Sequence, residues 1–291
     1  MTSLFRGMDR AALDAAYNNR DAVPNAAEIV AGWVERSAAY RARRPDAKLD
    51  VAYGAAAWRK LDFFPCADPA QAATAPTLAF IHGGYWQANE KSKFSFVAEG
   101  PNAEGFNVAV IGYPIAPAAD MDGIVSDVQA AVRWLGANLG TLGADRGKLY
   151  VSGHSAGGHL TAMTMTEQAV KGGVPISGIF ELEPIALCWL NDLLKLDGEQ
   201  VKRHSPQRRL PKKAAPLLVA VGAAELPELV RQSEEYWAAW SGAGLPGAYL
   251  ALDGHDHFTV LDQLARADGA ILAGLKRMAA GSAPLAQVNH H

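Results

Sequence analysis

Residues 148–163 read Lys-Leu-Tyr-Val-Ser-Gly-His-Ser-Ala-Gly-Gly-His-Leu-Thr-Ala-Met, a run of strand character followed by one of helical character. A G-x-S-x-G pattern, Gly153 to Gly157, lies at the junction. A strand–turn–helix of this kind is so sharp that its central serine is strained, and glycine two residues to either side avoids a collision. Ser155 would then stand at a helix N-terminus, where free N–H groups favour a developing anion. The stretch therefore predicts a nucleophilic serine.

A second motif, His82-Gly83-Gly84-Tyr85-Trp86, follows directly after the predicted strand 77–81. In α/β-hydrolases, an H-G-G-x segment at this place supplies backbone N–H groups to the oxyanion hole, together with the N–H of the residue after the nucleophile. The predicted donors here are Gly84, Tyr85 and Ala156. A Gly-Gly turn means little alone, but coupled to the serine turn it indicates acyl-transfer chemistry.

The rest of the chain alternates short apolar runs with amphipathic helical patterns. Continuous apolar runs are expected of strands covered on both faces, and the alternation predicts βαβ units. The alternation therefore predicts a three-layer α/β sandwich with a mostly parallel central sheet. Together with the two motifs, the expected fold class is an α/β-hydrolase fold with a small helical cover. The predicted strands are 49–53, 58–64, 77–81, 107–112, 148–152, 176–182, 216–221 and 248–252, and the main predicted helices are 121–139, 158–170, 227–241 and 261–278.

Two regions depart from the alternation within what we interpret as one domain, residues 1–291. Within residues 1–47, helices are predicted around 9–17 and 25–43, and residues 185–215 form a polar, basic stretch that is too long for an ordinary connection between helix and strand. We expect both to cover the C-terminal edge of the sheet, where open α/β sheets bind ligands. The alternative for 185–215 is a plain surface excursion.

A serine hydroxyl is a poor nucleophile near neutral pH and needs a histidine base that a carboxylate orients. In this fold, the chain order is serine, acid, histidine. Apart from the terminal pair at 290 and 291, typical of a purification tag, only His255 and His257 lie outside both motifs and the basic stretch. We predict His257 as the base, because the adjacent Phe258 can anchor its loop, and His255 as a solvated loop residue.

The acid is expected just beyond the strand at 216–221. Glu225 is the first carboxylate there and is the predicted acid. Glu228, one helical turn further on, is interpreted as a helix-surface charge. Asp256 is badly placed to orient the ring of its own neighbour, and Glu183, near the end of an earlier predicted strand, is the other structural possibility.

Composition excludes several classes of protein. The chain has 291 residues, 49% of them hydrophobic, and a formal net charge of −3, so neither nucleic acid nor an anionic membrane is expected as a partner. Cys66 and Cys188 are too few for a disulfide framework or zinc cluster and are expected to be buried free thiols. With no apolar signal segment or membrane span, a cytoplasmic location is expected. No cofactor or metal is predicted, and a homodimer is left open.

Together these motifs resemble the arylformamidase (kynurenine formamidase) branch of the α/β-hydrolases, near the hormone-sensitive-lipase-like esterases. The resemblance rests on the segments 82–87, 152–160, 178–185, 205–208, 231–233 and 256–258, with 17–20 also similar. It implies Ser155 as nucleophile and His257 as base. The family's acid is usually Asp, where this chain has Glu225. The implied reaction is hydrolysis of an aryl formamide such as N-formylkynurenine, with side activity on short-chain aryl esters.

The substrate is expected to be a small molecule with a tiny acyl group and a wide aromatic leaving group. Tyr85, Trp86 and Trp189 are predicted to line the wide side, although Trp189 is equally plausible in the core. Two other functions fit less specifically: a broad short-chain carboxylesterase, and a non-catalytic ligand receptor on the same scaffold. Basic residues of the 185–215 stretch either receive a substrate carboxylate or form a solvated face; they are Lys195, Lys202, Arg203, Arg208, Arg209, Lys212 and Lys213.

Overall fold

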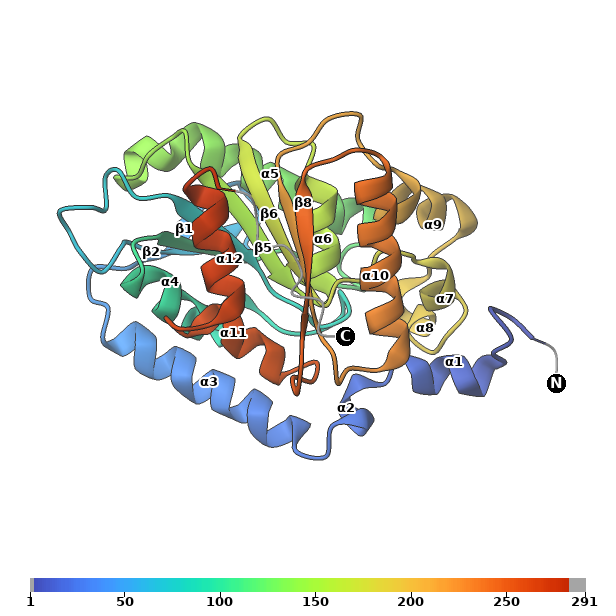
Figure 1. Cartoon of the computed structure of the whole chain (residues 1–291). Helices are drawn as coiled ribbons and strands as arrows, with labels where there is room; N and C mark the ends of the chain where they lie inside the picture. Colours follow the sequence, from blue (N-terminus) through green and yellow to red (C-terminus); the bar gives the residue numbers. More distant parts are fainter. Residues whose placement is uncertain (1–2, 283–291) are drawn as a thin grey trace.

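The computed structural model describes residues 3–282, so the histidines at 290 and 291 lie outside the described part of the chain. It contains an eight-stranded sheet between two layers of helices (Figure 1). The spatial order is β1-β2-β4-β3-β5-β6-β7-β8, and all pairs from β4 to β8 are parallel. This confirms the predicted fold class. The strands are β1 (Lys48–Ala52), β2 (Lys60–Phe64), β3 (Thr77–Ile81), β4 (Asn107–Ile111), β5 (Leu149–His154), β6 (Val170–Ile176), β7 (Leu217–Gly222) and β8 (Gly247–Leu252).

Side chains of the central strands alternate between two hydrophobic cores. In β3, Ala79 and Ile81 belong to one core, whereas Leu78 and Phe80 belong to the other. The strand is buried on both sides because helices cover both faces of the sheet.

The first core packs against α1 (Arg10–Ala16), α5 (Met121–Leu142), α6 (Ala156–Thr164), α7 (Glu183–Ala186), α8 (Asn191–Leu194), α9 (Gly198–His204) and α10 (Pro227–Gly242). The second packs against α3 (Ala26–Ala42), the 3₁₀ turns η1 (Lys91–Ala98) and η3 (Thr259–Leu261), α11 (Asp262–Ala265) and α12 (Ala270–Ala279). Of the remaining elements, α2 (Asn19–Ala22) precedes α3, α4 (Glu99–Ala103) contacts α11, and η2 (Pro206–Arg208) follows α9.

Helix α5 illustrates how local sequence sets an element. Asp120 caps its first turn by accepting a hydrogen bond from the N–H of Gly123, and Gly143 ends it with a left-handed backbone of φ +86°. Between these caps, Ile124 and Val128 lie on the predicted apolar stripe and are fully buried. The caps and the apolar periodicity indicate the same helix, so the sequence predicts it correctly.

The strand predicted at 176–182 is wrong. Strand β6 ends at Ile176, because Ser177 takes a left-handed backbone of φ +50° and turns the chain away from the sheet. Residues 170–175 contain two glycines and a proline, which are uncommon in the interior of a strand. At Gly172 and Gly173, however, a Cβ would lie 2.2 and 2.3 Å from methionine sulfurs, so packing on both faces of the sheet occupies that space.

Candidate active site

Ser155 stands in a strained turn between β5 and α6. Its backbone is left-handed, with φ +59° and ψ −120°. A Cβ at Gly153 would lie 2.3 Å from the carbonyl oxygen of Gly157, and one at Gly157 would lie 2.0 Å from that of Ile81. No side chain larger than hydrogen fits at either position. The glycines of the motif therefore allow the turn, which places Ser155 at the first turn of α6.

The glycine loop after β3 lies directly against this turn. A Cβ at Gly83 would approach the carbonyl oxygen of His154 to 2.6 Å and the Cβ of Ser155 to 3.0 Å. The next residues turn sharply, with φ +123° at Gly84 and +49° at Tyr85. Among the described residues, no protein group accepts a hydrogen bond from the backbone N–H of Gly84, Tyr85 or Ala156. These are free donors beside the serine, as an oxyanion hole needs.

Glu225 and His257 form a buried pair. The Nδ1 of His257 lies 2.6 Å from Oε2 of Glu225, and both side chains are almost fully buried. The other carboxylate oxygen accepts from the Ser177 hydroxyl (2.5 Å) and from the N–H of Gly222 (2.8 Å). Three donors thus hold the carboxylate, and the carboxylate in turn orients the imidazole through its Nδ1 edge. Sequence reasoning missed Ser177, because the turn that aims its hydroxyl lay inside the wrongly predicted strand.

The alternative acids do not contact His257. Asp256 accepts from the N–H groups of Phe258 and Thr259 and so caps its own turn. Glu183 pairs with Arg208 at the surface. Each has a local partner, so Glu225 is the carboxylate that the structure brings to His257.

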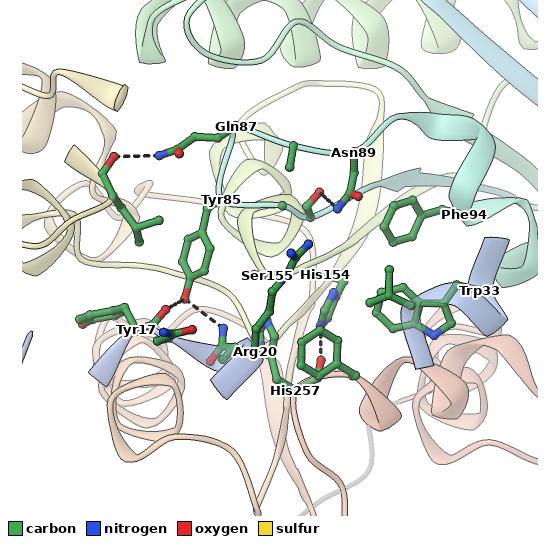
Figure 2. Close-up of a pocket in the computed structure, with 18 of the residues that line it drawn as sticks. Tyr17, Arg20, Trp33, Tyr85, Gln87, Asn89, Phe94, His154, Ser155 and His257 are labelled. Atoms are coloured by element: carbon green, nitrogen blue, oxygen red, sulfur yellow. Dashed lines mark hydrogen bonds between the residues drawn. The ribbon is translucent and has the colours of Figure 1, made fainter. Parts of the chain in front are cut away.

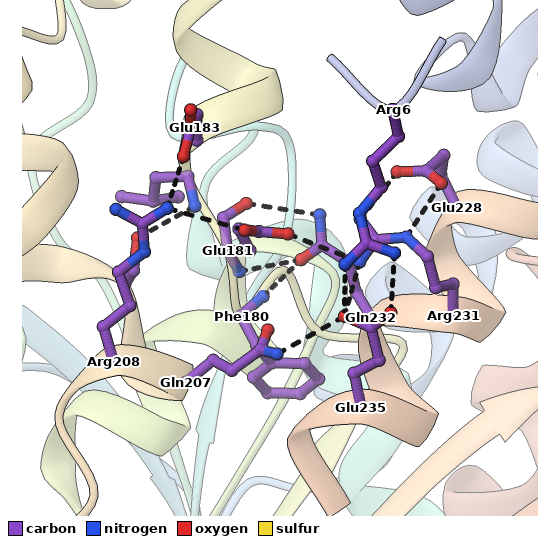
Figure 3. Close-up of polar contacts among 12 residues, drawn as sticks. Arg6, Phe180, Glu181, Glu183, Gln207, Arg208, Glu228, Arg231, Gln232 and Glu235 are labelled. Atoms are coloured by element: carbon purple, nitrogen blue, oxygen red, sulfur yellow. Dashed lines mark hydrogen bonds and ion pairs between the residues drawn. The ribbon is translucent and has the colours of Figure 1, made fainter. Parts of the chain in front are cut away.

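Glu228 is buried, contrary to the interpretation as a surface charge. It pairs with Arg231 at 2.7 Å and accepts a hydrogen bond of 2.9 Å from the hydroxyl of Tyr17. Gln232 donates to the same hydroxyl. Figure 3 shows this polar network, which also includes Arg6, Glu181 and Glu235. It fastens the N-terminal segment to α10, a long-range contact that periodicity does not reveal.

Ser155 and His257 line one cavity of about 340 Å³ (Figure 2). Its walls come from the N-terminal segment, the glycine loop, the loop after β8 and the start of the 185–215 stretch. Besides these two residues, the lining residues are Tyr17, Asn18, Asn19, Arg20, Val30, Trp33, Gly83, Gly84, Tyr85, Gln87, Ala88, Asn89, Phe94, His154, Trp189, Leu190, Leu193 and Phe258.

Of the three predicted substrate-binding residues, two line the cavity and one does not. Tyr85 lines the cavity, and its hydroxyl donates to the carbonyl of Tyr17. Trp189 also lines it and is 39% exposed. Trp86 does not, and the prediction for it is corrected: the side chain is fully buried, and its indole N–H donates to Nδ1 of His159. The positive φ of +59° at Trp86 turns it from the cavity into the core.

The seven basic residues of the 185–215 stretch that were candidates for a substrate carboxylate are not among the cavity-lining residues. Several pair with carboxylates elsewhere: Arg203 with Asp122, and Lys202 with Glu199. A solvated basic face, the alternative reading, describes them better. Arg20, which sequence reasoning did not single out, is the basic side chain that lines the cavity.

The three motif histidines are buried and neutral. Burial lowers the pKa of His82 to about 4 and that of His159 to about 3, and lowers the pKa of His154 well below its usual value. Each ring is also engaged with the protein: His154 pairs through Nε2 with the carbonyl of His257 (2.7 Å). In contrast, the Nε2 of His257 makes no hydrogen bond to the described residues. Of these four rings, His257 is the one that both lines the cavity and bonds to a carboxylate.

Stability should fall in mild acid because of these histidines. Unfolded, each binds a proton near pH 6.5, whereas folded His82 and His159 stay neutral to about pH 4 and 3. The unfolded chain therefore binds more protons, and acidification from pH 6.5 to 4 lowers the free energy of unfolding by roughly 3 kcal/mol per histidine. Denaturant unfolding between pH 7.5 and 4 measures this change. His82→Gln should take up about one proton fewer on unfolding; an unchanged uptake would contradict the assignment.

A parallel sheet that raises a strained serine between β5 and α6 is the architecture of the α/β-hydrolases, and this chain is a serine hydrolase of that fold. A family model described as BD-FAE matches residues 65–184. The kynurenine formamidase of Danio rerio is 34% identical over 229 residues, 74% of this chain and 76% of that protein. The chain belongs to the kynurenine formamidase family.

Solved structures agree on the fold. A Silicibacter protein proposed to be a thioesterase superposes with a TM-score of 0.80 at 28% identity, covering 90% of this chain and 97% of its own. A hyperthermophilic esterase of Pyrobaculum calidifontis superposes with a TM-score of 0.71 at 19% identity, covering 94% of each chain, and shows the fold alone. In the described residues, no helix is long and apolar enough to cross a membrane, and no cluster of three metal-binding side chains is found.

Proposed function

We propose that this protein hydrolyses aryl formamides of the N-formylkynurenine type, with Ser155 as nucleophile, His257 as general base and acid, and Glu225 as the carboxylate that orients it. The observation that carries the proposal is the hydrogen bond of 2.6 Å between His257 and Glu225 at the wall of the cavity that Ser155 also lines. Membership of the kynurenine formamidase family supports the formamide as substrate.

Two acyl transfers make up the proposed reaction. The imidazole of His257 takes the proton of the Ser155 hydroxyl while the oxygen attacks the formyl carbon. Backbone N–H groups of Gly84, Tyr85 and Ala156 bind the resulting oxyanion. The C–N bond then breaks, the arylamine leaves with the proton from His257, and a formyl ester remains on Ser155. Water attacks that ester by the same route and releases formate and the free serine.

Cavity shape favours a small acyl group and a flat, apolar leaving group. The wall beside Ser155 is formed by backbone of the glycine loop, whereas rings of Trp33, Phe94 and Trp189 line other parts of the cavity. A formyl carbon has no side chain to place against the loop, and an aryl ring is matched by aromatic side chains.

A broad short-chain carboxylesterase is the second candidate. Esters follow the same two steps with an alcohol as leaving group, and every proposed catalytic residue is shared. The Silicibacter relative, proposed to be a thioesterase, and the Pyrobaculum esterase show that ester chemistry is associated with this fold. The two candidates therefore differ only in the relative rates for formamide and ester.

The rate comparison decides between them. We expect kcat/KM for N-formylkynurenine to exceed that for p-nitrophenyl acetate, and Ser155→Ala to lower both by about 10³-fold or more, since only binding and oxyanion contacts remain. Steady-state assays of both substrates measure this, with a fluorophosphonate probe to label Ser155. A formamide rate no higher than that of the ester would favour the carboxylesterase, and absence of an adduct at Ser155 would favour the non-catalytic receptor.

Two glutamates three residues apart should behave differently. Glu225→Ala removes the partner of His257, and kcat should fall by about 10³- to 10⁴-fold with little change in KM. Glu228→Gln keeps the shape but weakens the pairing with Arg231, so thermal stability should fall while kcat stays within about threefold of the parent. Melting curves and steady-state kinetics of both variants test this. The reverse pattern would reassign the acid.

Ser177 should act as a positioning residue. Ser177→Ala leaves the Oε1 of Glu225 with the Gly222 N–H alone, and the loss of one charged hydrogen bond should lower kcat about 10-fold while KM changes little. Ser152→Ala is the matched control, because its buried hydroxyl donates to the carbonyl of Val174 and not to the acid. Equal kcat losses in the two variants would assign Ser177 a structural role only.

A further inference from the structure

We propose that Arg20 selects substrates that carry a carboxylate, so that the cavity discriminates against otherwise identical neutral molecules. The inference rests on the proposed function and extends it, because it assigns a charge to the preferred substrate and names the residue that binds this charge. It rests on where the guanidinium lies, on what surrounds it, and on how its backbone is held.

Charge in the cavity comes from one side chain. Arg20 lines the same cavity as Ser155 and His257, and Figure 2 shows it beside them. Among the cavity-lining residues that the structure describes, no other is lysine or arginine, and none is aspartate or glutamate. The guanidinium of Arg20 is therefore the fixed positive charge among the described lining residues, and it favours an anionic ligand over a neutral one.

Most arginines of the described chain are already paired. Three examples are Arg208, Arg203 and Arg231, which pair with the carboxylates of Glu183, Asp122 and Glu228, respectively. Across residues 3–282, by contrast, no group accepts a hydrogen bond from the guanidinium of Arg20. Its neighbour Asp21 accepts from the side-chain amide of Asn18 at 2.7 Å. The planar guanidinium therefore retains the paired donors that recognise a carboxylate.

The backbone that carries Arg20 is fastened to the glycine loop. The preceding Asn19 is buried and donates from Nδ2 to the hydroxyl of Tyr85 (2.9 Å). That hydroxyl donates to the carbonyl of Tyr17 (2.7 Å), and Tyr17 is in turn held by Glu228. The backbone of Arg20 is thus held in a fixed position relative to the glycine loop beside Ser155. A long side chain on a fixed base can bind a carboxylate at a repeatable distance from the reacting carbonyl.

Matched substrate pairs test the proposal. The probes are aryl formamides whose para substituent is a carboxylate on zero, one or two methylenes, each paired with the neutral carboxamide of the same length. The readout is the ratio of kcat/KM for the acid to kcat/KM for the amide. The parent should prefer the acid about 10-fold or more at one or more lengths, chiefly through KM. Raising the ionic strength should reduce this preference.

Variants identify the residue responsible. Arg20→Gln should bring the ratio close to one at every length, and Arg20→Lys should restore part of the preference, because charge is kept and the planar fork is lost. Arg133→Gln is the matched control: it removes one positive charge from α5, where Arg133 pairs with Glu167 away from the cavity. It should keep the parental ratio.

Failure of this inference is distinct from failure of the proposed function. If the parent hydrolyses formamide pairs but shows no preference for the acid at any length, or if Arg20→Gln keeps the preference, the role of Arg20 is wrong and the formamide proposal stands. If formamides are not hydrolysed, the proposed function is wrong. The same ratio measured on acetate esters with the same para substituents then tests Arg20 alone.

Discussion

The backbone of Ser155 depends on three places where the protein has no room for a Cβ atom. Gly153 faces the carbonyl of Gly157 within the turn, Gly157 faces the carbonyl of Ile81 at the end of β3, and Gly83 faces the turn from the neighbouring loop. The serine keeps a strained conformation because these close contacts leave it no relaxed alternative. One packing constraint thus sets both the direction of the Ser155 side chain and its position relative to the free N–H groups proposed to bind the oxyanion.

Long-range polar contacts then complete the cavity. The N-terminal segment is remote in sequence from the glycine loop, yet hydrogen bonds join Tyr17 and Asn19 to the hydroxyl of Tyr85. A largely buried ion pair, Arg231 with Glu228, holds the other end of Tyr17. Breaking such a buried pair is costly, since it leaves an uncompensated charge. The chain's first helices therefore act as a fixed wall and not merely as a cover.

Burial divides the histidines near Ser155 into two kinds. His82, His154 and His159 are kept neutral in the fold and bond to backbone carbonyls, so they serve the structure. His257 is buried as well, but it bonds to a carboxylate through one nitrogen and has the other available. A ring with a charged partner and a free nitrogen can accept a proton, whereas a neutral ring bonded to carbonyls and desolvated cannot readily do so.

The sequence alone determined the features that depend on short-range chemistry. The serine turn needs glycines at fixed spacing, and α5 carries its own caps and apolar stripe. The order serine, acid, histidine expected of the α/β-hydrolase fold points to Ser155, Glu225 and His257. Tertiary structure decided the rest. Glycine packing against methionine moved β6 to residues 170–176, burial took Trp86 away from the cavity, and Ser177, Glu228 and Arg20 acquired partners or positions from distant segments. Such contacts join residues far apart in the chain, and local periodicity contains no information about them.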